Sequence, residues 1–209
     1  RYRIFEENKT LLLMSDSTGA ERPGHSISEK TIQENLEDIF IHSQGRIIAA
    51  TFGSLISRIQ QLITLAEKFN RKVAIDGYSM KANVAIAQEL GYIKAKKGIF
   101  VDVDKLGNYP PEQQLVCCTG AQCESNAVLM RIAQKEHRSI QLGKGDTVIF
   151  SSKAIPGNEK SIYKIYNQLA HKNINVITSK ELDIHVSGHP CAEELRDLYK
   201  NLRPTSCIP

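Results

Sequence analysis

The chain has 209 residues, of which 41% are hydrophobic and 24% charged, and its formal net charge is +4 at pH 7. These values suit a globular protein with one domain or two small ones, and they give only mild support to a nucleic-acid partner. The aromatic content of 6% and the absence of tryptophan argue against a surface of base-stacking rings, and no apolar run is long enough to span a membrane.

The five cysteines show no Cys-x-x-Cys spacing, so neither a structural zinc site nor a disulfide framework is indicated. Cys117 and Cys118 lie in an apolar run and are predicted to be buried thiols. This usage is typical of a reduced, cytoplasmic protein. Arg1 is not a natural translation start, and a new apolar strand begins near Ile208, so we expect a piece excised from a longer protein.

Strand-like and helix-like segments alternate along the whole chain. Apolar runs of strand length predict strands at residues 10–15, 46–51, 72–76, 114–118, 146–151, 175–178 and 182–186. Apolar residues at the helical period predict helices at 28–42, 53–70, 79–90, 124–133, 158–171 and 190–202. Residues 91–111 read as a connector with one short strand, and Gly143-Lys144-Gly145 as a tight turn. The alternation predicts an α/β fold with a mainly parallel sheet flanked by helices on both faces.

Small polar and glycine-containing loops follow the predicted strands. They are Asp16-Ser17-Thr18-Gly19, Thr51-Phe52-Gly53-Ser54, Asp76-Gly77, Thr119-Gly120, Ser151-Ser152 and Ser187-Gly188-His189. Because the carboxyl ends of parallel strands meet at one edge of a sheet, where ligands bind, we expect these loops along a single rim.

Asp16 and His189 are the two candidates for chemistry. Asp16 follows an apolar strand, where a carboxylate can orient a histidine or ligate a metal, although a turn aspartate fits the local sequence better. His189 stands just before a helix predicted from Pro190. Unpaired N–H groups at a helix start suit a phosphate, and a histidine there can donate a proton to a leaving oxygen. The alternative for His189 is an ordinary helix-start residue.

The remaining candidates have plain alternatives. Ser54 could give a hydroxyl and N–H groups to a phosphate, but N-capping is the commoner role for a serine before a helix. The other histidines read as surface residues at His25, His42, His137 and His171, and as a core or edge residue at His185. Most of the scattered cations, Arg22 and Arg58 among them, read as solvated. No His-x-His-x-Asp-His cluster exists, so no metal site is expected in this chain.

Several short runs occur together in one order. They are Leu13-Met14-Ser15-Asp16-Ser17-Thr18, Ala20-Glu21-Arg22-Pro23-Gly24, Ala50-Thr51-Phe52, Arg58-Ile59-Gln60-Gln61, Thr119-Gly120-Ala121-Gln122-Cys123-Glu124, Gly145-Asp146-Thr147-Val148-Ile149-Phe150-Ser151-Ser152, Ile155-Pro156-Gly157-Asn158-Glu159 and Val186-Ser187-Gly188-His189. With these runs the chain resembles, over essentially its whole length, the β-CASP domain of ribonuclease J, a family of ribonucleases with a metallo-β-lactamase fold.

The resemblance implies a domain, residues 1–209, inserted into a metallo-β-lactamase domain that lies outside this chain and holds two metal ions, zinc or manganese. The parent would degrade single-stranded RNA as a 5′-to-3′ exonuclease, an endonuclease or both, and a homodimer of the parent stays open. Asp16 maps onto the family's motif A acid and His189 onto its motif B histidine, which pair near the scissile phosphate. Ser54, Ser187 and Gly188 map onto a pocket that senses a 5′-monophosphate. The isolated chain is expected to be inactive.

Three runs depart from the family pattern. In one of them Gly120-Ala121-Gln122-Cys123-Glu124-Ser125 replaces Gly-Ser-Gln-Gly-Glu-Pro. Gly53-Ser54-Leu55-Ile56-Ser57 replaces Ala-Ser-Asn-x-His and so loses an amide and an imidazole, and Ser187-Gly188-His189-Pro190-Cys191 replaces Ser-Gly-His-Ala-Ser and so exchanges a hydroxyl for a thiol. These changes leave two other hypotheses open. The piece could be an RNA-clamping or partner-docking module of a catalytically altered parent, or part of a related hydrolase acting on DNA or other phosphoesters.

Overall fold

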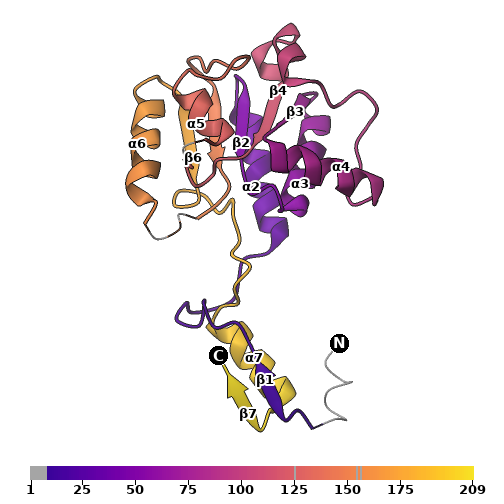
Figure 1. Ribbon diagram of the computed structural model, residues 1–209, viewed down its shortest axis with the longest axis vertical. Helices are drawn as coiled ribbons and strands as arrows, with labels where there is room; N and C mark the ends of the chain where they lie inside the picture. Colours follow the sequence, from indigo (N-terminus) through magenta and orange to yellow (C-terminus); the bar gives the residue numbers. More distant parts are fainter. Residues whose placement is uncertain (1–8, 125, 154, 156) are drawn as a thin grey trace. The chain divides into compact units, whose positions relative to one another are not determined.

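The computed structural model describes residues 9–124, 126–153, 155 and 157–209, so Arg1, Ser125 and Pro156, quoted above, lie outside the described residues. The chain divides into two compact units (Figure 1). The terminal unit joins Arg1–Glu29 to Val186–Pro209, and the sheet unit is Lys30–His185. Each unit is described by itself.

The sheet unit contains a five-stranded sheet of order β3-β4-β2-β5-β6, in which each neighbouring pair is parallel. The strands are β2 (Ile47–Ala50), β3 (Lys72–Asp76), β4 (Gln114–Cys118), β5 (Thr147–Phe150) and β6 (Asn175–Thr178). Ala50 aligns with Cys118 on one side and with Phe150 on the other, so these three strands end at the same level. The loops that follow them form a common carboxyl edge.

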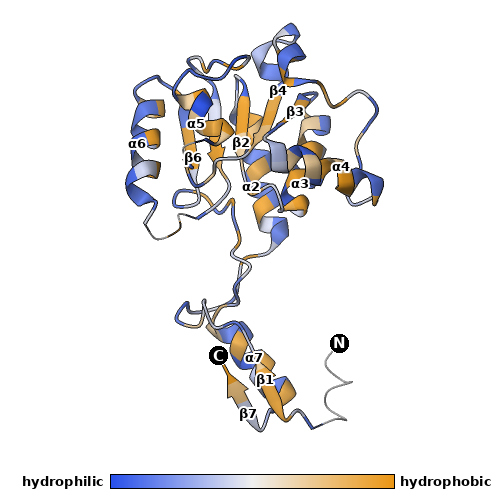
Figure 2. Ribbon diagram, viewed as in Figure 1, coloured by the Kyte–Doolittle hydropathy of each residue, from blue (hydrophilic) through white to orange (hydrophobic). Residues whose placement is uncertain are grey.

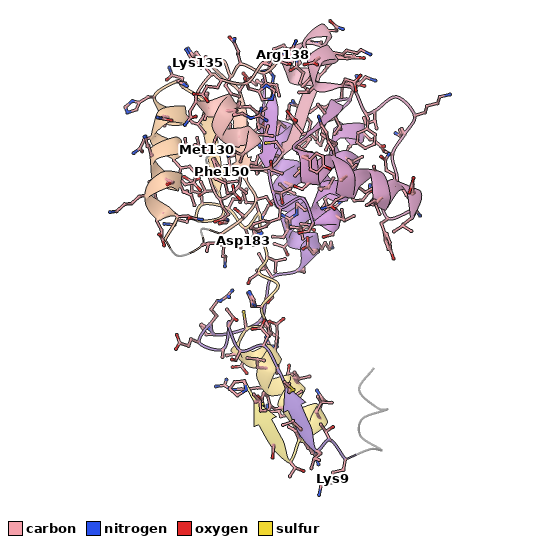
Figure 3. All side chains as sticks on the ribbon, viewed as in Figure 1. Lys9, Met130, Lys135, Arg138, Phe150 and Asp183 are labelled. Carbon is pink, nitrogen blue, oxygen red and sulfur yellow. The ribbon has the colours of Figure 1, made fainter. Side chains whose placement is uncertain are left out.

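Helices cover this sheet on both faces. They are α2 (Glu29–His42), α3 (Ile56–Lys68), α4 (Tyr78–Glu89), α5 (Val128–Ala133) and α6 (Glu159–Ala170). Every residue of β2, β4 and β5 is buried, which requires cover on each face. Met130 of α5 and Phe150 of β5, labelled in Figure 3, belong to one core cluster with residues of α6. The buried stripes of α2 and α3 lie outside that cluster and cover the opposite face.

The hydropathy of the elements follows from this layering. Figure 2 shows β2 and β4 as apolar strands, whereas α6 and α3 carry both apolar and polar residues, as expected of helices with one buried side. Burial raises the pKa of the Cys117 thiol to about 12, and all five cysteines are free thiols. The prediction of buried thiols at Cys117 and Cys118 is therefore confirmed.

The connector between α4 and β4 is largely irregular, as its weak periodicity predicted. It contains the 3₁₀ helices η1 (Val103–Asn108) and η2 (Pro111–Gln113). A single parallel bridge joins Val73 to Phe100, at the place of the short strand expected there. The predicted turn at residues 143–145 also forms, with Gly145 at φ +88°.

The terminal unit is a two-stranded parallel sheet with one helix. β1 (Leu12–Met14) pairs with β7 (Ser206–Ile208), and α7 (Ala192–Leu202) lies between them in the chain. The Tyr199 hydroxyl contacts Cys207 Sγ, which places α7 against the sheet face that carries Cys207. Leu12, Met14 and Ile208 alternate onto the other face and are 46%, 72% and 50% exposed. This face of β1–β7 is therefore bare and apolar.

Two expectations about the elements are wrong. Residues 182–186 form no strand, because the Ile184 carbonyl accepts hydrogen bonds from the Ser151 hydroxyl at 2.7 Å and from the Arg58 guanidinium instead of from a neighbouring strand. The six polar loops do not all follow strands of one sheet either. Four of them follow strands of the five-stranded sheet, whereas the loops at Asp16 and at Ser187-Gly188-His189 belong to the terminal unit.

Two side chains expected at the surface are buried. Arg58 is fully buried and also donates to the Ser151 hydroxyl at 2.9 Å, so it ties α3 to the loop after β5. His137 is 7% exposed and contacts Asp76. Both side chains have partners that lie far away in the chain, so the sequence around them did not indicate their burial.

Candidate functional site

Asp16 and His189 meet in the terminal unit although 173 positions separate them in the sequence. His189 Nδ1 and Asp16 Oδ2 lie 2.5 Å apart. The two side chains are 50% and 43% exposed, respectively, so a ligand can reach the pair. The structure thus places the two candidates in direct contact at an open surface.

Hydrogen bonds from His189 and from the turn after β1 hold Asp16 in its ionised form. The Thr18 N–H donates to Asp16 Oδ1 at 2.8 Å, while His189 contacts the other oxygen. The hydrogen bond from His189, followed by the one from the Thr18 backbone, lowers the pKa of Asp16 from 3.8 to about 2. The carboxylate is therefore an acceptor at any physiological pH.

Backbone contacts hold His189 in its position. Its own N–H donates to Ser187 Oγ at 3.3 Å, and Arg22 Nη2 donates to the same oxygen at 3.4 Å. A Cβ added to Gly19 would lie 2.2 Å from the Pro190 carbonyl oxygen, so only glycine allows the turn after Asp16 to approach the chain after His189 this closely.

This geometry defines what the imidazole can do. Because Asp16 accepts at Nδ1, the neutral ring carries its proton there and Nε2 is the free nitrogen. Nε2 makes no hydrogen bond with any other described residue. A ring that is oriented by a carboxylate and exposes its second nitrogen can give or take a proton at a ligand oxygen.

The start of α7 does not supply the unpaired donors expected beside His189. The Ala192 N–H donates to the Arg22 carbonyl at 2.9 Å, and the Glu193 N–H donates to the Gly24 carbonyl at 3.2 Å. The helix also begins at Ala192 after an N-cap at Cys191, not at Pro190. The prediction that free N–H groups beside His189 bind a phosphate is therefore wrong, because these N–H groups already donate to carbonyl groups of the chain.

The three predicted phosphate contacts fall in different units. Ser187 and Gly188 belong to the terminal unit, where Ser187 is half-buried and Gly188 exposed. Ser54 belongs to the sheet unit and is exposed in the turn before α3. The N-cap of that helix is Leu55, so capping does not explain the serine.

Sequence reasoning missed a second aspartate–histidine pair, Asp76 with His137, in the sheet unit. His137 Nε2 lies 2.8 Å from Asp76 Oδ2, and His137 Nδ1 accepts the N–H groups of Ser139 and Ile140 at 3.2 and 3.0 Å. Lys81 Nζ lies 3.4 Å from the second oxygen of Asp76. Asp76 stood out in the sequence as a strand-end acid, but nothing near His137 signalled the pairing.

Within the described ranges, no three histidine, cysteine, aspartate or glutamate side chains come together as ligands for a metal ion. The same residues include no helix that is both long enough and apolar enough to cross a membrane.

Comparisons with known proteins all identify one family. The family model described as the beta-CASP domain of ribonuclease J matches residues 44–169. The chain is 40% identical over 205 residues to ribonuclease J of Synechocystis sp., covering 98% of this chain and 32% of that protein. It is 40% identical over 210 residues to ribonuclease J of Helicobacter pylori, covering 30% of that protein. It is 42% identical over 209 residues to ribonuclease J 1 of Streptococcus pyogenes, covering 37% of that protein. The chain therefore spans about a third of the length of these relatives.

Proposed function

The chain belongs to the β-CASP domain family of ribonuclease J, and on this premise we propose that it binds RNA and completes the active site of a metal-dependent ribonuclease. The relatives named ribonuclease J match this chain from end to end at about 40% identity. The observation that carries the proposal is the contact between Asp16 and His189, because it joins the two residues that the family resemblance assigns to catalysis.

In this proposal His189 acts on the scissile phosphodiester through Nε2. The protonated ring donates to the leaving oxygen or stabilises negative charge that develops in the transition state. Asp16 keeps the ring in one orientation, with its proton at Nδ1, and stabilises the imidazolium form. The exposure of both side chains supports this role, since a substrate must reach the ring.

The metal ions belong to another part of the proposed parent. The family resemblance assigns the two divalent ions, zinc or manganese, to the metallo-β-lactamase domain, and the described residues of this chain bring no set of metal ligands together. That domain would supply metal-activated water, and this chain would supply the orientation of the substrate and the proton at His189.

The bare face of β1–β7 supports a domain partner in the same parent chain. Leu12, Met14 and Ile208 expose apolar surface on a two-stranded parallel sheet. Such a sheet is marginal by itself, and parallel sheets are normally covered on both faces. We propose that the metallo-β-lactamase domain covers this face.

The substrate in this proposal is single-stranded RNA, with Ser54, Ser187 and Gly188 contacting a 5′-monophosphate. The exposure of Ser54 and Gly188 supports this part. The free thiols of all five cysteines support a cytoplasmic location. Exonuclease or endonuclease action, and a homodimer of the parent, remain predictions from the family resemblance.

The test uses the full-length protein that contains this domain. Single-stranded RNA carrying a 5′-monophosphate or a 5′-hydroxyl is incubated with the protein and zinc or manganese, and products are resolved by length. We expect metal-dependent cleavage that is faster on the 5′-phosphorylated strand, and no cleavage by residues 1–209 alone. Equal cleavage rates on the two RNAs would contradict the proposed 5′-monophosphate contacts. A full-length protein that cleaves neither RNA would contradict the proposed ribonuclease activity.

A further inference from the structure

A small cavity lies at the carboxyl edge of the five-stranded sheet. It has a volume of about 310 Å³ and is lined by Thr51 after β2, by Thr119 and Gly120 after β4, and by Ser79 in the first turn of α4. β2 and β4 are neighbours in the sheet, and the loops that follow both strands belong to its carboxyl edge. Ligands of open parallel sheets bind at this kind of position.

Thr51, one of the lining residues, carries a buried hydroxyl that has no hydrogen-bond partner among the described residues. Thr51 is 1% exposed, and its Oγ1 makes no hydrogen bond with any described residue, although its backbone N–H donates to the Cys118 carbonyl at 3.1 Å. Buried polar side chains are nearly always paired, because an unpaired one costs free energy. A hydroxyl in this state at the wall of a cavity is a group that a ligand can satisfy.

The first turn of α4 adds unpaired backbone donors. Its N-cap is Gly77, which has no side chain to cap the helix, and the intrahelical pattern begins with the Lys81 N–H donating to the Gly77 carbonyl. Within the described part of the chain, the N–H groups of Tyr78, Ser79 and Met80 have no hydrogen-bond partner. Donors of this kind and the helix dipole together favour an anion.

Two glycines keep this helix start open. Gly77 has φ +111°, and a Cβ there would lie 2.7 Å from Thr119 Oγ1. A Cβ on Gly53 would lie 3.2 Å from the Met80 nitrogen. A side chain at Gly53 would therefore crowd the Met80 N–H, and one at Gly77 would overlap Thr119 at the wall of the cavity.

We propose that this cavity binds a phosphate group of the RNA backbone, held by the Thr51 hydroxyl and the first N–H groups of α4. The inference rests on the proposed function for the identity of the ligand as RNA. Ser54 does not line the cavity, so this phosphate contact is additional to the 5′-monophosphate contacts proposed above. The exposed carboxylate of Glu124 also lines the cavity and opposes an anion, which limits the affinity.

The test is a titration of the 209-residue chain followed by amide NMR, with inorganic phosphate in one arm and a 5′-hydroxyl oligouridine in the other. The oligouridine contains only internucleotide phosphates. We expect both probes to shift the Tyr78, Ser79 and Met80 amide signals. Shifts with inorganic phosphate alone would overturn the RNA assignment, and no shift with either probe would overturn the site.

Variants show whether the hydroxyl binds the ligand. Thr51→Val keeps the shape, and its loss of one hydrogen bond should weaken binding of both probes about fivefold. Its melting temperature should not fall, because the removed hydroxyl is unpaired in the free protein. Thr147→Val makes the same change at a buried strand residue of the opposite edge and should leave affinity unchanged. Unchanged affinity in Thr51→Val would overturn the proposal.

The sign of the charge effect gives a second readout. Glu124→Gln removes an opposing carboxylate and should tighten phosphate binding about twofold. Weaker binding in this variant would mean that the cavity takes a cation or a hydrogen-bond donor, which overturns the proposal. Failure of the proposed function looks different, because the full-length protein would then leave RNA intact while phosphate still shifts the Ser79 amide.

Discussion

Two aspartate–histidine pairs in this chain show the same contact in opposite surroundings. Asp16 and His189 lie at an open surface of the terminal unit, and the Nε2 of that ring makes no hydrogen bond with another described residue. Asp76 and His137 are buried in the sheet unit, where Asp76 occupies one ring nitrogen and two backbone N–H groups occupy the other. The first ring can still exchange a proton with a ligand, whereas the second ring has no nitrogen left for one.

The causes of the lowered carboxyl pKa values differ as well. Burial by itself raises the pKa of Asp76, but hydrogen bonds from His137 and the Gly77 N–H, together with the Lys81 charge, bring it below its ordinary value. For Asp16 the hydrogen bond from His189 is the largest cause and burial opposes it only weakly. A perturbed acid beside a histidine is therefore not sufficient evidence of a catalytic site, and the accessible second ring nitrogen is the feature that distinguishes the two pairs.

The largest expected effect is on catalysis at the exposed pair. His189→Ala in the full-length protein should slow RNA cleavage about 10²- to 10⁴-fold, because general acid catalysis contributes effects of this order. The rate is measured under single-turnover conditions with labelled RNA. His25→Ala is the matched control, since His25 also pairs with an aspartate, Asp197, on the surface of the terminal unit. An equal loss in both variants would contradict a specific role for His189.

The second effect is on stability at the buried pair. His137→Leu removes the partner of Asp76 and leaves the Ser139 and Ile140 N–H groups without an acceptor, so the free energy of unfolding should fall by about 2–4 kcal/mol. Urea denaturation of the 209-residue chain measures it. His189→Leu should change the same quantity little, because its pair is exposed. Similar losses of unfolding free energy in the two variants would contradict the conclusion that only the Asp76–His137 pair is structural.

Much of the sheet was predictable because local pattern decides it. The strands at Lys72–Asp76, Gln114–Cys118 and Asn175–Thr178 match the predicted ranges, since short apolar runs without polar interruption fit a sheet covered on both faces. The strand expected at 182–186 failed because the buried Ile184 carbonyl finds Arg58, which is 126 positions away. A partner this far away in the chain cannot be predicted from the pattern of about ten neighbouring residues.

For the candidate site, too, local sequence pattern predicted some features and missed those that depend on distant residues. Asp16 and His189 were candidates because of their local settings at a strand end and before a helix, and the family resemblance paired them. Their spacing in the sequence carried no sign of the contact. His137 was missed because its partner Asp76 is 61 positions away and its own neighbours are polar. The helix-start donors were expected at α7 but are occupied there, while α4 keeps its own free because its N-cap is glycine.

A smaller effect should follow from moving the exposed pair without removing it. In Gly19→Ala the new methyl group would overlap the Pro190 carbonyl oxygen, so the turn that carries Asp16 must shift away from His189. Overpacking of this kind costs about 1–3 kcal/mol, and we expect RNA cleavage by the full-length protein to slow about tenfold. Gly107→Ala, where a Cβ meets nothing within 4 Å, is the control and should cleave at the normal rate.

The smallest effect is the titration of Asp16 itself, and it tests the contact without any assay of activity. Its pKa of about 2 lies below the ordinary 3.8, so the contact stabilises the fold fully above pH 4 and loses this contribution as the pH falls toward 2. In His189→Ala the midpoint should rise toward 3.8, although the Thr18 N–H still holds it somewhat low. Carboxyl carbon shifts followed by NMR from pH 6 to pH 1.5 measure this, and Asp76 serves as the internal control because its partner His137 is untouched. A midpoint that stays near 2 in the variant would mean that the turn alone perturbs Asp16, and the exposed pair would then lose the physical coupling that distinguishes it from two neighbouring surface residues.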